Sequence, residues 1–574
     1  MSRRTVYVNA RVFTAGEVEW AEAIAVDGGT ILAVGTEDEV RAAAAASAVG
    51  ASAAAPDAPG AGETSDVDVV DLDGRLVLPG VVDAHTHLVM MGEALGRVGL
   101  TDARSLDEIR ARLVAAHAAA PDAPRVLGRG WLFDSVPGGA PTATMLDEVL
   151  PDVPVYLDAN DYHSCWVNEA ALAELGITRD TPDPIGGRIG RDAAGEPDGM
   201  LYETAAQQYA WEHLAEQATD ADRDAAVERT IAAYLAAGVT GVVDMAFDEL
   251  GLAAFRRAAE RRGGTLPIRV VAHWFVANTG DEAQNLAQVE RAVALAAEVD
   301  TPWLRIAGIK LVLDGVIDAC TAAMRHPYVD GSNAEPIWPA DALEPVVAAA
   351  DAAGLQVAMH AIGDAASGIA LDALEHAHAV NGERERRHRI EHLEYVDRAD
   401  VARLAHLGVV ASMQPVHADP AIWANWAAML GDERADRGFP WTEITDAGAV
   451  LAFSTDAPTA PHEALPNLYV AATRRSALDD AFPANHPEYA VPLADAVRHA
   501  TRDAAYSCRE EDVRGRLAPG LAADFAVIDR DPFELGDDAL LEARVIRTVV
   551  AGATAYEAGS RLAEVTDGAE RAVA

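Results

Sequence analysis

The sequence predicts a mixed α/β protein built around a (β/α)8 barrel. Two observations predict it: apolar, strand-like runs alternate with alanine-rich stretches of helical periodicity, and the alternation continues for about eight repeats. Such a pattern is typical of a parallel sheet with helical crossovers, and eight repeats close into a barrel. The candidate strands are 81–87, 154–159, 239–245, 268–275, 304–313, 355–361, 388–393, 408–415 and 449–456.

The interval 88–238 is too long for a single loop. It predicts a subdomain at about 93–238, inserted after the first barrel strand, and we assign the candidate strand 154–159 to this insert. Eight strands then remain for the barrel. Helical periodicity follows several of them, at 341–353, 364–379 and 398–407.

Both ends of the chain are rich in short strands and turns. The stretch 39–66, rich in Ala, Ser, Gly, Pro and acidic residues, predicts a helix end followed by a flexible loop. Residues 515–556 resemble the front of the chain in character. We predict that both ends build one small β-sandwich; two separate caps are the alternative. The predicted domains are 1–78 plus 507–574 for the sandwich and 79–506 for the barrel.

The chain is strongly acidic, with a formal net charge of −46. Such a surface repels nucleic acid and anionic membranes. The charge fits a protein that works in high salt, like those of a halophile; an ordinary acidic composition is the alternative. No uncharged apolar run reaches the ~18 residues of a membrane span, and the N-terminus lacks a signal-type apolar core. The three cysteines are scattered, so no disulfide framework is expected. We therefore expect a cytoplasmic protein.

Polar side chains end several of the predicted barrel strands. The C-terminal strand ends form the active-site face of such a barrel, so these side chains would converge. His85 and His87 share one face of their strand and could close on one metal ion, although a strand can also end in two histidines by chance. Six polar residues lie at the ends of the predicted strands: His85, His87, Lys310, His360, His392 and Asp456.

Lys310 is the only lysine of the chain, since the other 44 of its 45 basic residues are arginine. Arginine can serve wherever only a positive charge is wanted, whereas a reaction at a primary amine needs lysine. The composition therefore points to amine chemistry at Lys310, against the alternative that one lysine remained by chance.

Five motifs resemble the amidohydrolase superfamily of metal-dependent hydrolases, in particular the amidohydrolase family 3 branch that includes N-substituted formamide deformylases. The resemblance covers nearly the whole chain, including the insert and the closing strand near 515–525. The main departures are the alanine-rich stretch 41–66 and the scarcity of lysine. The motifs are LPGVVDAHTH at 78–87, KLVLDG at 310–315, HAIGD at 360–364, RIEH at 389–392 and STD at 454–456.

The resemblance implies a metal centre. His85 and His87 would bind one divalent ion together with Asp456, and His360 and His392 would bind a second. A Lys310 carboxylated by CO2 would bridge the two ions; the same ligands also allow one ion with an unmodified lysine. Nitrogen and oxygen ligands suit zinc best, with Mn²⁺, Fe²⁺ or Co²⁺ as alternatives.

The resemblance also implies hydrolysis of a non-peptide C–N bond in a small amide or formamide. The metal would supply an acidic water, and Asp456 would act as general base and then as general acid. Lys310 and His360 complete the expected catalytic set. Hydrolysis of a cyclic amide or an ester, or a catalytically silent relative stabilised by metal, are the alternatives. A homodimer is expected by analogy only.

Other polar residues have weaker support. His163 and Glu203 lie in the insert and are candidates for substrate contact, with a structural histidine or a capping carboxylate as the alternatives. Asp314 and Asp364 are expected to support ligands or turns rather than bind metal. His417 lies in a predicted loop that could border the pocket.

Overall fold

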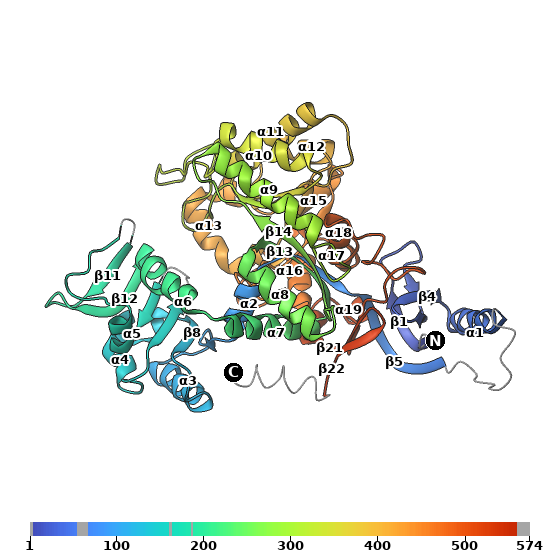
Figure 1. Ribbon diagram of the computed structural model, residues 1–574, viewed down its shortest axis with the longest axis horizontal. Helices are drawn as coiled ribbons and strands as arrows, with labels where there is room; N and C mark the ends of the chain where they lie inside the picture. Colours follow the sequence, from blue (N-terminus) through green and yellow to red (C-terminus); the bar gives the residue numbers. More distant parts are fainter. Residues whose placement is uncertain (1–3, 54–66, 160–163, 185–186, 560–574) are drawn as a thin grey trace. The chain divides into compact units, whose positions relative to one another are not determined.

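The computed structural model describes residues 4–53, 67–159, 164–184 and 187–559. The chain divides into two compact units. One consists of Met1–Leu88 with Ile231–Ala563, and the other of Val89–Thr230 with Glu564–Ala574. The first unit holds the barrel and a sheet formed by both chain ends, and the second holds a separate sheet within the insert (Figure 1).

Eight parallel strands form the nearly closed barrel, which confirms the predicted α/β class. Neighbouring strands pair in the order β19-β18-β17-β16-β15-β14-β13-β6, so sequence order is also spatial order. Their interiors are almost wholly buried, as expected for strands covered by helices on the outer face. The strands are β6 (Val81–Thr86), β13 (Val239–Phe247), β14 (Arg269–Phe275), β15 (Leu304–Val312), β16 (Gln356–Ala361), β17 (Arg389–His392), β18 (Val410–Met413) and β19 (Leu451–Phe453).

The segment that follows β19 joins the last strand to the first. The backbone N–H of Asp456 donates to the carbonyl of His85 at 2.8 Å, and the N–H of His87 donates to the carbonyl of Ala457 at 2.9 Å. These bonds lie at the C-terminal end of β6. The place where the barrel is tied together is therefore also the place where three of the predicted metal ligands meet.

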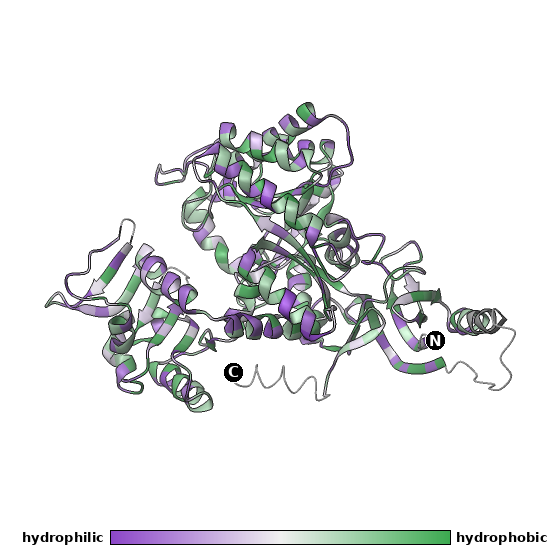
Figure 2. Cartoon of the chain, viewed as in Figure 1, coloured by the Kyte–Doolittle hydropathy of each residue, from purple (hydrophilic) through white to green (hydrophobic). Residues whose placement is uncertain are grey.

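Helices cover the outside of the barrel, and α10 (Ala340–Ala352) packs against it through one apolar stripe. In α10, Leu343, Val346, Val347 and Ala350 are buried, with the three- and four-residue spacing of a single helix face. Figure 2 shows hydrophobic and hydrophilic residues alternating along these helices. The helices that follow successive strands include α8 (Glu249–Arg261), α9 (Glu282–Glu298), α10 (Ala340–Ala352), α11 (Asp364–Asn381), α12 (Arg398–His406), α13 (Trp423–Leu430), α15 (Trp441–Asp446), α16 (Ala464–Thr473), α17 (Leu493–Ala500) and α18 (Arg502–Ser507).

Strands from both chain ends pair in one eight-stranded sheet. β5 is parallel to β1 and antiparallel to β20, so an N-terminal strand lies directly beside a C-terminal one. The rings of Tyr7 and Phe525 meet edge to face in its core, 5.0 Å apart. The strands are β1 (Arg4–Phe13), β2 (Trp20–Ala21), β3 (Ala23–Asp27), β4 (Thr30–Gly35), β5 (Val67–Pro79), β20 (Phe525–Ile528), β21 (Val545–Val550) and β22 (Ala553–Glu557).

A helix packs on this terminal sheet. α1 (Glu37–Ala53) places Val40 and Ala44 against Val6 and Ala25. The helix is longer than the helix end predicted for 39–66, because an unbroken alanine-rich run favours helix; residues 54–66 lie outside the described part of the chain. A sandwich of two packed sheets stays a prediction.

The insert has a six-stranded sheet of its own. The run 154–159 supplies its strand β9 (Val155–Ala159), and the strands pair in the order β11-β12-β10-β9-β8-β7. Trp131 and Trp166 pack edge to face at 5.3 Å in its core. The other strands are β7 (Val98–Gly99), β8 (Val126–Trp131), β10 (Ser164–Val167), β11 (Gly187–Arg191) and β12 (Pro197–Glu203). Across the described residues, every helix is too short or too polar to cross a membrane.

We predict that Gly241→Ala destabilises the barrel. A Cβ at this position of β13 would lie 1.1 Å from Nη1 of Arg514, whose buried guanidinium forms an ion pair with Glu510. The buried ion pair must shift, so we expect a loss of about 1–3 kcal/mol in urea unfolding. Gly16→Ala is the matched control, because its Cβ meets only Thr14 Oγ1 at 3.4 Å. Equal stability of the two variants would contradict the prediction.

Candidate metal centre

The six sequence-predicted residues all lie at the C-terminal side of barrel strands. His85 is in β6, Lys310 in β15 and His360 in β16, while His392 ends β17. His87 and Asp456 follow β6 and β19. His85, Lys310, His392 and Asp456 are buried, and His87 and His360 are partly so. The structure therefore brings together side chains that are up to 371 positions apart, as between His85 and Asp456.

Asp456 lies close to both histidines of the first strand, His85 and His87. Oδ1 of Asp456 lies 3.2 Å from Nε2 of His85 and 3.0 Å from Nε2 of His87. Yet, among the described residues, this buried oxygen has no hydrogen-bond partner. Four ligands at tetrahedral zinc distances are roughly 3.3 Å from one another, close to these separations. The atoms are thus placed like ligands around a shared cation, and the residues fit a divalent metal.

His392 and His360 extend the cluster. The ring of His392 lies 4.9 Å from that of His85 and 4.4 Å from that of His360, measured between ring centroids. One ligand atom from each of His85, His392 and Asp456 lies within 4.8 Å of the others. The backbones of His392 and Asp456 have φ of 77° and 59°, a region that costs energy for residues other than glycine. The fold holds two candidate ligands in strained positions.

Lys310 is buried next to these groups. Burial lowers the pKa of its amine to about 8, with the negative charges of Glu391 and Asp456 acting in the opposite direction. Burial also lowers the pKa of His360 to about 3, and the charge of Lys310 contributes to that shift. The amine therefore interacts directly with the cluster. The lowered pKa raises the fraction of unprotonated amine above that of an ordinary lysine, and this is the form that can react with CO2.

A buried charge network orients His85. Its Nδ1 donates to Oε2 of Glu391 at 2.7 Å, which leaves the lone pair of Nε2 facing Asp456. Arg389 donates to the same carboxylate and, at 2.6 Å, to the carbonyl of Ala84. Burial raises the pKa of Glu391, but Arg389 and His85 outweigh it and hold this pKa well below its usual value. Sequence patterns assign no role to Glu391; the available signal is that Arg389 and Glu391 share one face of their strand.

The ring orientation of His392 and His360 is fixed in the same way. His392 Nδ1 donates to Oε1 of Gln414 at 2.8 Å, and Gln414 in turn donates to Ser454. Nε2 of His392 therefore carries a free lone pair. His360 Nε2 donates to the carbonyl of Gly315 at 3.2 Å, which leaves Nδ1 free. Each histidine offers one unprotonated nitrogen, as a metal ligand must.

Glu394 and His417 form a second pair beside the cluster. His417 Nδ1 lies 3.2 Å from Oε1 of Glu394, and its Nε2 lies 3.8 Å from Oδ2 of Asp456. Burial lowers the pKa of His417, but the two carboxylates outweigh it and the net shift is upward. Together with His392, this pair could also hold a metal ion. The sequence placed His417 only in a loop that could border the pocket.

Other predicted residues lie outside the cluster or support it. Asp314 accepts hydrogen bonds from the backbones of Ala323, Ile362 and Gly363, which holds the loop after His360 in place. Burial raises its pKa to about 7.

Two predictions concern residues of the insert. Glu203 is an exposed residue that ends β12, with φ of 52°, so its contact with substrate stays a prediction. His163 lies outside the described residues.

The barrel and its cluster are of the kind found in metal-dependent hydrolases. The sequence model described as "Amidohydrolase family" matches residues 68–556, and the chain belongs to this family. The chain is 32% identical to the protein LONG AFTER FAR-RED 3 of Arabidopsis thaliana, over 85% of this chain and 83% of that protein. It is 28% identical to the N-substituted formamide deformylase of Arthrobacter pascens, over 97% of this chain and 98% of that enzyme. It also resembles the crystal structure of an uncharacterized metal-dependent hydrolase from Pyrococcus horikoshii, with TM-score 0.73, 25% identity, and 93% and 99% coverage.

We predict that Glu391→Gln strongly destabilises the metal-free protein. The substitution leaves the charge of Arg389 buried without a counter-charge, which costs about 3–5 kcal/mol. Urea unfolding followed by near-ultraviolet circular dichroism measures the loss. Glu249→Gln is the control: its ion pair with Arg291 is about half exposed and should contribute under ~1 kcal/mol. If both variants lose the same small amount, the Arg389–Glu391 pair does not stabilise the centre.

Proposed function

We propose that this protein is a metal-dependent hydrolase that cleaves a non-peptide C–N bond in a small amide or formamide. The observation that carries the proposal is Oδ1 of Asp456, which lies 3.2 Å from Nε2 of His85 and 3.0 Å from Nε2 of His87 and has no hydrogen-bond partner among the described residues. The relative named as a formamide deformylase, matched over almost its whole length, supports the bond type.

The ligand assignment follows the arrangement of the side chains. His85, His87 and Asp456 would hold one divalent ion, most simply zinc. His360 and His392 would hold a second, with a carboxylated Lys310 between them. When bound, such an ion lowers the pKa of a coordinated water towards neutrality and polarises a substrate carbonyl.

Asp456 is the proposed proton carrier. Burial raises the pKa of its carboxyl, but His85 and His87 outweigh it and hold this pKa well below its usual value, so the group is ionised and ready to accept a proton. Oδ2 is the oxygen turned away from these histidines and towards His417. In the proposed reaction Oδ2 takes the proton of the attacking water and later delivers it to the leaving nitrogen. His417 and Glu394 position this oxygen.

Lys310 and His360 have distinct proposed roles. The Lys310 amine would react with CO2 to give a carbamate, whose two oxygens can bridge metal ions. His360, kept neutral by its low pKa, would bind metal and lie beside the substrate carbonyl. Both roles require an uncharged nitrogen, and burial of the two side chains favours it.

The wider organisation is also a proposal. We propose a terminal β-sandwich domain of residues 1–78 and 507–574 beside a barrel domain of residues 79–506. We further propose that the protein is cytoplasmic, acts on a small molecule rather than nucleic acid or membrane, and forms a homodimer. The acidic charge of −46 supports the exclusion of polyanionic partners.

Two alternatives use the same residues. A cyclic amide or an ester would be hydrolysed by the same proton transfers. A catalytically silent, metal-stabilised relative is favoured by one observation: the plant relative has a name that denotes no enzyme.

A substrate screen tests the proposed function. Protein loaded with Zn²⁺ or Mn²⁺ is incubated with N-substituted formamides, acyl amines, cyclic amides and esters, and release of amine or carboxylate is measured. We expect turnover of at least one formamide or acyl amine that disappears on chelation. Turnover of esters or cyclic amides alone would contradict the proposal and favour that alternative. A protein that binds metal but turns over none of these compounds would favour the metal-stabilised silent relative.

Asp456→Asn should stop turnover while leaving metal bound. The amide keeps an oxygen ligand but cannot accept a proton, so we expect a loss of about 10²–10⁴ in kcat. Metal content is measured by mass spectrometry on the same samples. Asp446→Asn, on the exposed end of α15, is the control. Near-normal activity of Asp456→Asn would show that another group carries the proton.

Lys310→Arg tests the carbamate. Arginine keeps a positive charge but cannot form a carbamate, so bound metal should fall by at least one ion per chain in the two-ion arrangement, and activity should be lost. Metal stoichiometry of purified protein is the measurement. Unchanged metal content together with unchanged activity would rule out a carboxylated lysine.

A further inference from the structure

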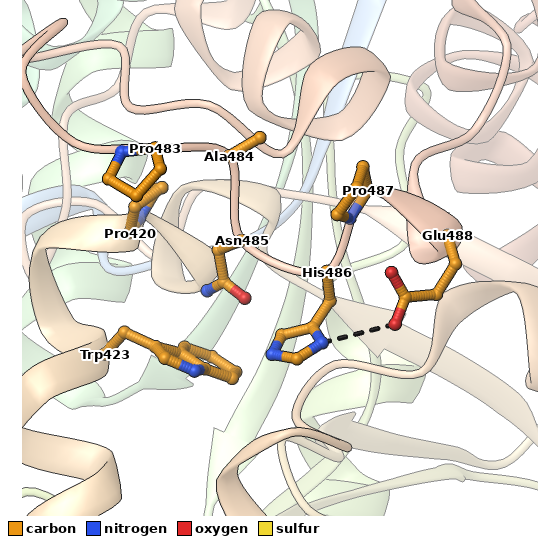
Figure 3. Close-up of a pocket in the computed structure, with 8 residues that line it drawn as sticks. All are labelled: Pro420, Trp423, Pro483, Ala484, Asn485, His486, Pro487 and Glu488. Atoms are coloured by element: carbon orange, nitrogen blue, oxygen red, sulfur yellow. Dashed lines mark hydrogen bonds and ion pairs between the residues drawn. The ribbon is translucent and has the colours of Figure 1, made fainter. Parts of the chain in front are cut away.

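A cavity of about 310 Å³ lies between the segment after β18 and the loop 483–488. Figure 3 shows its lining side chains, drawn from these two segments. Its walls include Pro420, Trp423, Pro483, Asn485, His486 and Glu488. None of these residues belongs to the metal cluster, and the proposed reaction does not use them. The cavity therefore calls for a separate explanation.

Asn485 presents an unused hydrogen-bond acceptor to this cavity. Its backbone is fixed twice, because its N–H donates to the carbonyl of Arg474 at 2.9 Å and its carbonyl accepts from Nε of Arg474 at 2.8 Å. Its Nδ2 lies 3.5 Å from the carbonyl of Ala418, which can only accept, so the amide oxygen is directed the other way. Asn485 is 6% exposed, and Oδ1 is buried without a hydrogen-bond partner in the described part of the chain. Buried acceptors are normally satisfied, so this oxygen points to a donor from outside the chain.

The walls around this oxygen are aromatic and rigid. The rings of Trp423 and His486 lie 4.9 Å apart, and Trp423 stacks on Trp426 at 5.5 Å. Figure 3 shows the amide of Asn485 directed towards Trp423 and His486. Prolines 420, 483 and 487 line the same space, and their fixed φ angles limit the entropy lost when a ligand binds.

The charges at the cavity are negative. Oε1 of Glu488 lies 3.2 Å from Nδ1 of His486, and Oδ1 of Asp436 lies 3.6 Å from Nε2 of the same ring. A hydrogen bond from its own backbone, with a smaller contribution from His486, lowers the pKa of Glu488 and keeps it ionised. The cation of Arg474 is buried and donates to backbone carbonyls. Glu488 is a lining residue, and its carboxylate attracts a cation to the cavity.

We propose that this cavity binds a small organic ammonium ion. An N–H of the ligand donates to Oδ1 of Asn485, its charge lies near Glu488, and its apolar substituent packs on Trp423 and the prolines. The binding claim is independent of the proposed C–N hydrolysis, although the amine released by that reaction would belong to the same chemical class. The site is also close to the metal centre in the sequence, because Ala418, whose carbonyl lies 3.5 Å from Nδ2 of Asn485, directly follows His417.

Isothermal titration with benzylammonium at neutral pH tests the proposal, with benzyl alcohol as the uncharged ligand of the same shape. We expect saturable binding with one site per chain, and benzyl alcohol binding at least ~10-fold more weakly. Asn485→Ala and Trp423→Leu should each weaken benzylammonium binding ~10-fold or more, because each removes a direct contact to the ligand. Asn425→Ala, on the exposed side of the same helix α13, should bind like the parent protein.

Removal of metal separates this site from the metal centre, since an amine could also bind a metal ion. Treatment with EDTA should leave benzylammonium affinity unchanged. Loss of binding after chelation, or equal binding of benzyl alcohol, would overturn the proposal. So would unchanged affinity in Trp423→Leu, which serves as the deciding variant if Asn485→Ala unfolds.

Discussion

The hydrogen bonds that close the barrel are the constraint on which the metal centre depends. They join the backbone of Asp456 to that of His85, and the backbone of His87 to that of Ala457. Because these bonds fix the backbones, the carboxylate of the last strand meets the two imidazoles of the first strand at 3.0–3.2 Å. The positive φ of Asp456 is the local cost of this arrangement. The same hydrogen bonds therefore close the barrel and bring the candidate metal ligands together.

The residues around the cluster favour neutral nitrogen atoms and ionised carboxylates, although all of these groups are buried or partly buried. Burial disfavours charge on Lys310 and on His360, whereas Arg389 and the imidazoles favour ionised Glu391 and Asp456. His85, His392 and His360 are each oriented by a hydrogen bond on the other ring nitrogen, as in metal sites whose ligands are held by neighbouring groups. A bound cation would stabilise the lone pairs that face one another here, which is why the geometry argues for metal.

The sequence predicted the barrel strands and the six cluster residues because both depend on local patterns: apolar runs, and polar residues at the ends of those runs. It did not predict the residues that orient the cluster. Glu391 and Gln414 acquire their roles only through the register of neighbouring strands, and His417 through the path of a loop. The length of α1 was underestimated because its alanine-rich run continues into a loop-like composition. Pairings across hundreds of positions leave no local signature, so these contacts had to come from the structure.

Anomalous X-ray diffraction from crystals grown with Zn²⁺, recorded on both sides of the zinc absorption edge, tests the central claim most directly. The account predicts at least one strong anomalous peak within bonding distance of Nε2 of His85 and Oδ1 of Asp456. It is contradicted if zinc is found elsewhere on the molecule while the space between these two atoms shows no anomalous signal.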